Sequence, residues 1–310
     1  MPGLTFNTYG KSDVRLTQVL RDGEQHEVVE LSVKILFQGD FAESYTRADN
    51  SKVLPTDTMK NTVYAIARER PITSIEEFAR RLAGHFLKRV AALKTVSIEI
   101  HQTPWAHIGK HGSAFVREGT ESRMTALTAT HSQEELVSGL RNLEILKTGN
   151  SAFTGYMKDE FTTLPETRDR LLGTVLDADW TYRTGAQRAW MRTAKQQKEL
   201  ASSSGGTLDT APVLRDSLGE IGFNDCHAGI RKVLLDSFAN HNSESVQHTL
   251  FAMAQAALKE FSVIKSVHLV MPNRHRLLVD LSKFGLDNPN QIFVPTAEPS
   301  GYIEARVDAE

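Results

Sequence analysis

Apolar and polar residues alternate in two stretches near the start of the chain. The apolar positions of this alternation are Val14, Leu16, Val29, Leu31, Val33 and Ile35. Because successive side chains of a strand point to opposite faces, a period of two predicts strands with one buried face each. The chain is therefore predicted to open with a pair of strands.

A helical period follows between residues 56 and 90. The polar run Thr56-Asp57-Thr58 is predicted to cap a helix that extends to about Glu69, and Pro71 separates it from a second helix. Apolar residues at helical spacing mark this second helix: Ile75, Phe78, Leu82, Phe86 and Val90. Alternation then returns at Val96, Ile98, Ile100, Met124 and Ala126. The first half of the chain is therefore predicted to have the order ββααββ.

The second half repeats this order. Strands are predicted at residues 143–146, 176–182, 267–271 and 278–281, with two helices that carry Ile230, Val233, Leu234, Phe238, Val246, Leu250, Met253, Ala257 and Phe261. We predict an α+β fold of two tandem domains, residues 1–138 and 139–310, each an antiparallel four-stranded sheet with its helices on one face. The uncovered faces and edges of such sheets favour oligomerisation. A polar insertion near residues 185–222, rich in Ser and Gly, interrupts the second repeat.

Composition and charge restrict the partners of the chain. Its 310 residues are 40% hydrophobic and 24% charged, with a formal net charge of −2 at pH 7. This balance gives no basic surface for nucleic acid or an anionic membrane. The sequence has no apolar run long enough to span a bilayer and no signal peptide at its start. The single cysteine, Cys226, needs no oxidising compartment, so a cytoplasmic protein is expected.

The familiar motifs for nucleotide cofactors, catalytic metals and serine nucleophiles do not occur in the sequence. His107 and His111 have i, i+4 spacing, but Gly109 and Gly112 argue against a helix that would aim both at one metal ion. Cys226 is followed by His227, yet adjacent residues on a helix do not face each other. Cys226 is therefore interpreted as a small buried hydrophobe. We predict no metal site and no cofactor.

Several short segments follow one another in a recognisable order. They are Tyr9-Gly10-Lys11, Ala48-Asp49-Asn50-Ser51, residues 56–64 (TDTMKNTVY), residues 162–170 (TTLPETRDR), Ser245-Val246-Gln247, residues 269–275 (LVMPNRH) and Asp287-Asn288-Pro289-Asn290. Together they resemble the signature segments of the urate oxidase family, from residue 9 to about residue 307. The resemblance implies two tunnelling-fold domains per chain and a homotetramer around a tunnel, with active sites shared between subunits.

The resemblance also assigns catalytic roles. Lys11 and Thr56 would form a proton-relay dyad that acts with His275 through water, and Asp57 would place a backbone group at the substrate ring. Asn273 and Thr56 would hold dioxygen or water above the substrate. A helix N-terminus at Thr56 and Asp57 would also favour an anion, so capping and catalysis are compatible.

The substrate-binding residues implied by the resemblance are Thr56, Asp57, Phe153, Arg170, Val246, Gln247 and Asn273. Phe153 would stack on the flat purine. Arg170 would grip one edge of the urate anion with its planar fork, where lysine would supply charge without paired geometry. Gln247 offers a donor and an acceptor to the adjacent carbonyl and N–H groups of urate, and Val246 offers its backbone N–H.

Each of these residues also has an ordinary structural interpretation. Phe153 and His275 suit a core, Thr56-Asp57 a helix cap, Asn273 a turn, and Lys11, Arg170 and Gln247 an exposed surface. Ser113 also stands where the family usually has the second histidine of His-x-His-x-Phe, in the segment His111-Gly112-Ser113-Ala114-Phe115.

The reaction implied by the resemblance needs no cofactor. Urate that has lost a further proton can give electrons directly to dioxygen. The protein therefore has to deprotonate urate, hold it in place and keep other molecules out of the site. The products would be 5-hydroxyisourate and H2O2. Two alternatives stay open: a metal-dependent pterin or purine enzyme of the same fold, and a catalytically silent purine-binding oligomer. The chain lacks a C-terminal peroxisomal tripeptide, which favours a bacterial cytoplasmic member of the family.

Overall fold

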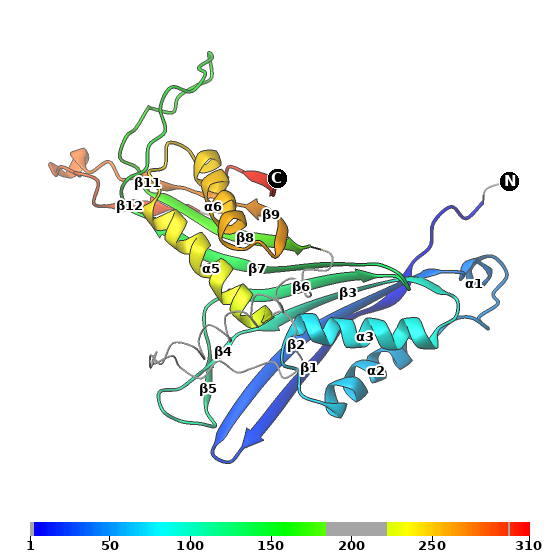
Figure 1. Cartoon of the computed structure of the whole chain (residues 1–310). Helices are drawn as coiled ribbons and strands as arrows, with labels where there is room; N and C mark the ends of the chain where they lie inside the picture. Colours follow the sequence, from blue (N-terminus) through cyan, green and yellow to red (C-terminus); the bar gives the residue numbers. More distant parts are fainter. Residues whose placement is uncertain (1–2, 184–221, 297) are drawn as a thin grey trace, which may run out of the picture. The chain divides into compact units, whose positions relative to one another are not determined.

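The computed structural model describes residues 3–183, 222–296 and 298–310 (Figure 1). They fall into two compact units, which we call unit 1 and unit 2. Unit 1 takes its described residues from Met1–Gly139 and Thr181–His227, and unit 2 takes them from Leu140–Trp180 and Ala228–Glu310. The insertion predicted near residues 185–222 lies outside the described residues, apart from Gly222.

Unit 1 is a sheet with two long helices on one face (Figure 1). Its strands, in spatial order, are β1 (Tyr9–Asp22), β2 (Gln25–Gly39), β3 (Leu93–Thr103), β6 (Ser122–Ala129) and the first part of β7 (Glu134–Lys147). The pairs β1–β2, β2–β3 and β3–β6 are antiparallel. The helices are α1 (Ala42–Thr46), α2 (Thr56–Glu69) and α3 (Ile75–Arg89), and β4 (Trp105–His107) pairs with β5 (Phe115–Arg117).

The core of unit 1 lies between this sheet and α2 and α3. Alternate residues of β2 and β3 are buried, among them Val33, Ile35, Phe37, Val96, Ile98 and Ile100. The rings of Phe37 and Phe86 meet edge to face, with their centroids 5.1 Å apart. Burying a side chain of this size stabilises the fold by about 1.5–3 kcal/mol, so the sheet and α3 hold each other in place.

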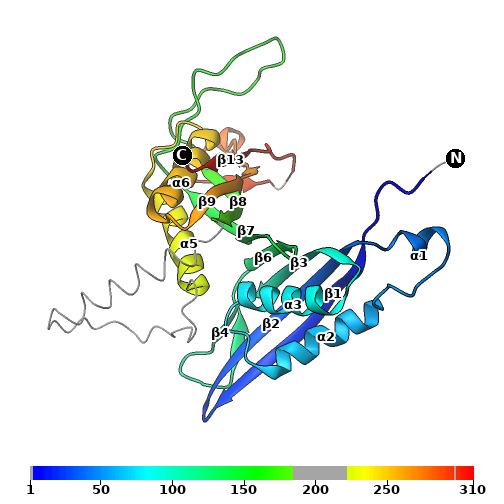
Figure 2. The ribbon, with the colours of Figure 1, turned by 45° about the vertical axis from the view of Figure 1, so that its right-hand side comes forward.

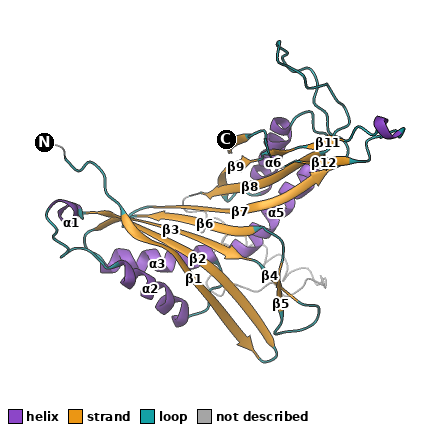
Figure 3. Ribbon diagram, turned by 180° about the vertical axis from the view of Figure 1, so that it is seen from behind, coloured by secondary structure: helices purple, strands orange, loops and turns teal. Residues whose placement is uncertain are grey.

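Unit 2 repeats the arrangement, with helices on one face of a sheet (Figures 2 and 3). Its strands, in spatial order, are the second part of β7, β8 (Leu172–Tyr182), β9 (Ile264–Val270) and β13 (Glu304–Asp308), and β10 (Asn273–Arg274) also pairs with β8. The helices are most of α5 (Phe223–Asn240), α6 (Val246–Glu260) and the 3-10 turn η1 (Ser282–Phe284). A separate two-stranded sheet consists of β11 (Arg276–Leu278) and β12 (Phe293–Pro295).

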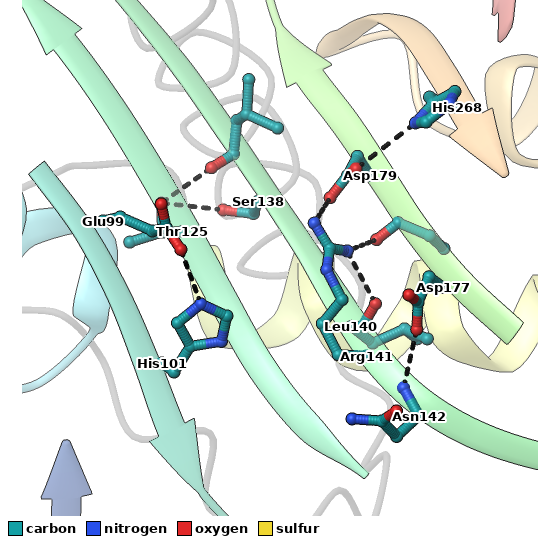
Figure 4. Close-up of polar contacts among 12 residues, drawn as sticks. Glu99, His101, Thr125, Ser138, Leu140, Arg141, Asn142, Asp177, Asp179 and His268 are labelled. Carbon is teal, nitrogen blue, oxygen red and sulfur yellow. Dashed lines mark hydrogen bonds and ion pairs between the residues drawn. The ribbon is translucent and has the colours of Figure 1, made fainter. Parts of the chain in front are cut away.

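The two faces of the unit 2 sheet differ in polarity. Leu176, Ala178 and Trp180 alternate along β8 on the buried face. On the opposite face, Arg141 pairs with Asp179 at 2.6 Å and Asp179 contacts His268 at 3.4 Å (Figure 4). These polar side chains come from three neighbouring strands, so the face that the helices leave uncovered is a polar one.

The structure confirms the α+β class and the tandem ββααββ order, with one correction. The last strand was predicted at residues 278–281, but the fourth strand of unit 2 is β13, at Glu304–Asp308. Leu277 and Leu278 belong to β11 and are exposed. The prediction failed because apolar residues marked an exposed strand, while β13 has only the short alternation of Ala305 and Val307.

Candidate active site

Lys11 lies at an irregularity in the first strand. β1 and β2 pair in register at Lys11 and Ile35, and the register shifts before Val14. Asp13, within this bulge, has a left-handed φ of 55°. At Gly10 a Cβ atom would lie 1.8 Å from the carbonyl oxygen of Ile35, so only glycine permits this approach of the strands. Bulges redirect neighbouring side chains and are common beside active sites.

Thr56 and Asp57 begin α2, but their side chains do not cap it. The N-cap residue is Pro55, and no side chain makes a capping hydrogen bond. The prediction of a cap at Thr56-Asp57-Thr58 was therefore wrong. Thr56, Asp57 and Thr58 already belong to the first helical turn, because Pro55 holds the extended backbone conformation that precedes the helix. The half-buried Thr56 hydroxyl is thus not used for capping.

The carboxylate of Asp57 is held by its own helix. It accepts hydrogen bonds from Lys60 at 2.6 Å and from Asn61 at 2.9 Å. The hydrogen bond from Lys60 lowers the pKa of Asp57, and the nearby charge of Lys11 adds a smaller effect. Lys11 therefore lies close to the start of α2. Within residues 3–183 no direct hydrogen bond joins Lys11 to Thr56.

In unit 2, Arg170 lies against Phe153. The guanidinium carbon is 5.2 Å from the centre of the ring, and Nε donates to Ser151 Oγ at 3.3 Å. Arg170 Nη2 is buried and has no hydrogen-bond partner among the described residues. Burial lowers the pKa of Arg170, from a value so high that the group stays charged. A half-buried cation with one buried, unused donor beside an aromatic ring suits a flat anion.

Two residues around this pair were not predicted from the sequence. Ser151 holds Arg170 by its backbone as well, since Arg170 N donates to Ser151 O at 3.0 Å. The ring of Tyr156 stacks on Phe153, with centroids 4.7 Å apart and an interplanar angle of 14°. The only available signal was the i, i+3 spacing of the two aromatic residues, which is too common to indicate a site.

Val246 and Gln247 form the first turn of α6. Ser245 is the N-cap, and its hydroxyl accepts a hydrogen bond from the backbone N–H of His248 at 3.1 Å. The first N–H groups of a helix have no intrahelical acceptor, and the helix dipole makes this end positive. Val246 is buried and Gln247 is exposed. The turn therefore offers backbone donors and one amide side chain to a ligand.

Asn273 lies beside the first residues of β8, and His275 follows it two residues later. Asn273 pairs with Thr174 through β10, and its backbone N–H donates to Gly301 O at 2.8 Å. Its Nδ2 lies 3.5 Å from His275 Nδ1. His275 stands between β10 and β11, and its carbonyl accepts a hydrogen bond from Thr296 N at 2.9 Å. Both side chains are half-buried.

The site residues that the resemblance implied thus form two groups. Lys11, Thr56 and Asp57 belong to unit 1. Unit 2 holds Phe153, Arg170, Val246, Gln247, Asn273 and His275. Direct contacts join Phe153 to Arg170 and Asn273 to His275.

The histidines and the cysteine considered earlier have structural contacts. His107 Nδ1 lies 3.0 Å from the backbone carbonyl of His111, and the His107 ring packs on Phe115 with centroids 4.5 Å apart. Cys226 is buried near the start of α5, and burial raises the pKa of its thiol to about 12. The interpretation of Cys226 as a buried hydrophobe is confirmed.

Fold and site together define an α+β protein of tandem ββααββ units in which a guanidinium group packs against an aromatic ring. Among the described residues, no helix is long and apolar enough to cross a membrane. The chain belongs to the uricase family, whose model matches residues 7–128 and 136–304.

Individual relatives cover almost the whole chain. It is 36% identical to a uricase of Cyberlindnera jadinii, over 98% of this chain and 96% of the relative, and 35% identical to a uricase of Arthrobacter globiformis, over 98% and 89%. The crystal structure of the Arthrobacter globiformis uricase superposes with a TM-score of 0.85 at 34% identity, covering 100% of this chain and 96% of that one.

Proposed function

We infer that the chain is a urate oxidase, which converts urate, O2 and water to 5-hydroxyisourate and H2O2. Membership of the uricase family supports this activity. The observation on the chain itself that carries it is the half-buried Arg170 side chain against the Phe153 ring, with a buried Nη2 that has no hydrogen-bond partner among the described residues. Urate is a flat anion at neutral pH, so it matches both the charge and the ring.

The two groups of residues divide the work of binding. Arg170 pairs with one edge of urate, Phe153 stacks on its face, and Gln247 bonds an adjacent carbonyl and N–H pair. Val246 adds its backbone N–H from the positive end of α6. From the other group, Asp57 and Thr56 contribute at the start of α2. These interactions hold the ring in one orientation for the reaction.

The second task is proton transfer. Lys11, Thr56 and His275 take a proton from the bound urate monoanion, and the resulting dianion gives two electrons to O2. O2 takes up these two electrons together with the proton removed from urate and one further proton from solvent, and it leaves as H2O2. Water then adds to the oxidised ring to give 5-hydroxyisourate. Asn273 and Thr56 hold first O2 and then water beside the ring. Because urate itself supplies both electrons, this scheme requires no metal and no cofactor.

The active unit in this proposal is a homotetramer. The domains are residues 1–138 and 139–310, and each site combines Lys11, Thr56 and Asp57 of one subunit with the other group from a neighbouring subunit. The division of the site residues between the two units supports this arrangement. We also propose a cytoplasmic location, because the single, buried Cys226 takes part in no disulfide.

A spectrophotometric assay tests the proposal. Urate consumption should match H2O2 release, and a strong chelator should leave the rate unchanged. Lys11→Met should lower kcat by about 10²–10⁴-fold, the usual contribution of general base catalysis. The same variant should still bind xanthine, which shares the six-membered ring of urate. Chelator-sensitive turnover would favour a metal enzyme. An unmodified chain that binds xanthine but does not consume urate would favour a silent purine-binding protein.

A further inference from the structure

Lys147 is a buried lysine for which the reaction scheme has no use. It ends β7, and only 8% of the residue is exposed. Among residues 3–183, 222–296 and 298–310, no carboxylate pairs with it. Burial lowers the pKa of its ammonium group. Burying a lysine in this way is costly unless its hydrogen-bond donors find acceptors.

The acceptors are backbone carbonyls at the end of α5. Lys147 Nζ donates to Phe238 O at 3.3 Å and to Ala239 O at 3.2 Å, and it also donates to His241 O. The last carbonyls of a helix lack intrahelical donors, and a cation there is favoured by the helix dipole. Lys147 therefore joins the end of β7 to the end of α5, more than 90 residues further along the chain.

From these two joined ends, two segments run side by side. Ser243 N donates to Asn150 O at 2.9 Å, and Ala152 N donates to Ser243 O at 2.7 Å. Ser151 and Ser243 form a parallel bridge, and both are buried. One segment leads directly to Phe153, and the other leads to Val246 and Gln247.

Buried hydroxyls extend the connection to both sets of substrate-binding residues. Ser151 holds Arg170 through the two hydrogen bonds described above. Thr249 Oγ1, in α6, donates to Ser243 Oγ at 2.7 Å and lies 3.1 Å from Ser245 O. The Phe153–Arg170 pair and the first turn of α6 are thus connected through one network of hydrogen bonds, which runs from Lys147 through Ser151 and Ser243.

We propose that Lys147 is a positioning residue for urate binding, which fixes the spacing between the Phe153–Arg170 pair and the first turn of α6. The proposal rests on the substrate roles given to those residues above. Lys147 does not touch the substrate in this scheme. Its loss should therefore weaken the binding of substrate and transition state together, which raises KM and leaves kcat nearly unchanged.

The test is Lys147→Met, which keeps an unbranched side chain and removes all three donors. The expected result is a rise of about tenfold or more in the KM for urate and in the Kd for xanthine measured by calorimetry, with kcat within about threefold of wild type. Lys147→Gln, which keeps an amide donor, should give a smaller rise. It also provides the test if Lys147→Met does not fold.

Matched controls separate positioning from charge and from stability. Lys232→Met removes an exposed lysine of α5 that pairs with Asp236, and it should leave KM unchanged. Ser74→Ala removes the N-cap of α3 in unit 1 and should lower thermal stability without changing KM. In a double variant, Lys147→Met and Arg170→Lys should raise KM by less than the product of their separate effects, because both act on the same contact.

Two results would overturn the proposal. In the first, Lys147→Met and Lys147→Gln melt at lower temperature but keep wild-type KM and xanthine Kd, so Lys147 only stabilises the fold. In the second, kcat falls while KM is unchanged. If Arg170 does not bind the substrate at all, a different result is expected: the Arg170→Lys variant would bind xanthine as tightly as wild type.

Discussion

At the scale of single residues, the Arg170 fork is the feature best suited to recognise urate. Nε donates to Ser151, the ring of Phe153 lies alongside, and the buried Nη2 has no partner within the described part of the chain. Arg170→Lys keeps the charge but loses the paired donors, and hydrogen bonds to charged groups contribute about 1.5–3 kcal/mol each. We expect xanthine Kd and urate KM to rise about 10–100-fold, measured by calorimetry and steady-state kinetics. An unchanged Kd would exclude Arg170 from the site.

A second residue-scale prediction concerns alkaline pH. Burial raises the pKa of the Cys226 thiol from its ordinary value of 9.0 to about 12. Above pH 9 the unfolded chain loses this proton and the folded chain keeps it, so Cys226 favours unfolding as pH rises. This contribution lowers the free energy of unfolding by about 1.4 kcal/mol per pH unit between these values. Urea unfolding at pH 8 and pH 10 should show a smaller loss for Cys226→Ala than for wild type, and equal losses would contradict the assignment.

At the scale of secondary-structure elements, the starts of α2 and α3 differ in what their polar residues do. Ser74 accepts a hydrogen bond from the backbone N–H of Glu77 and caps α3, whereas Thr56 makes no capping bond in α2. Ser74→Ala should therefore lower stability by about 1 kcal/mol and leave kcat unchanged. Thr56→Ala should change stability by less than about 0.5 kcal/mol and lower kcat strongly. Chemical unfolding and kinetics of both variants check this, and a reversed pattern would return Thr56 to a capping role.

At the scale of the whole molecule, the proposed shared site predicts complementation between inactive subunits. In an isologous pair of Lys11→Ala and Arg170→Ala chains, one site carries both changes and the other carries neither. Random mixing should thus restore about a quarter of all sites, because half of the pairs are mixed and half of their sites are intact. The measurement is urate turnover after co-expression, with mass spectrometry to show that mixed oligomers form. Mixed oligomers without activity would place both groups in one chain.

The sequence by itself determined the order of elements and the class of the fold. Alternation at Val33 and Ile35, and the helical stripe at Phe78 and Leu82, are set by local burial, and every one of these residues is buried. Local periodicity reports burial directly, since the spacing of apolar residues follows the geometry of the element itself. Local periodicity did not predict β13, because this strand has only two alternating apolar residues, Ala305 and Val307.

Only part of the candidate site could be predicted from the sequence. Local patterns gave Lys11, Arg170 and Gln247 ordinary surface roles, and the family resemblance named them as functional. Tertiary structure decided the rest: the bulge at Lys11, the attachment of Arg170 to Ser151, and the burial of Lys147 against the end of α5. The physical reason is distance along the chain. The partners of Lys147 are more than 90 residues away, and no local period records which carbonyls a lysine will meet once the chain has folded.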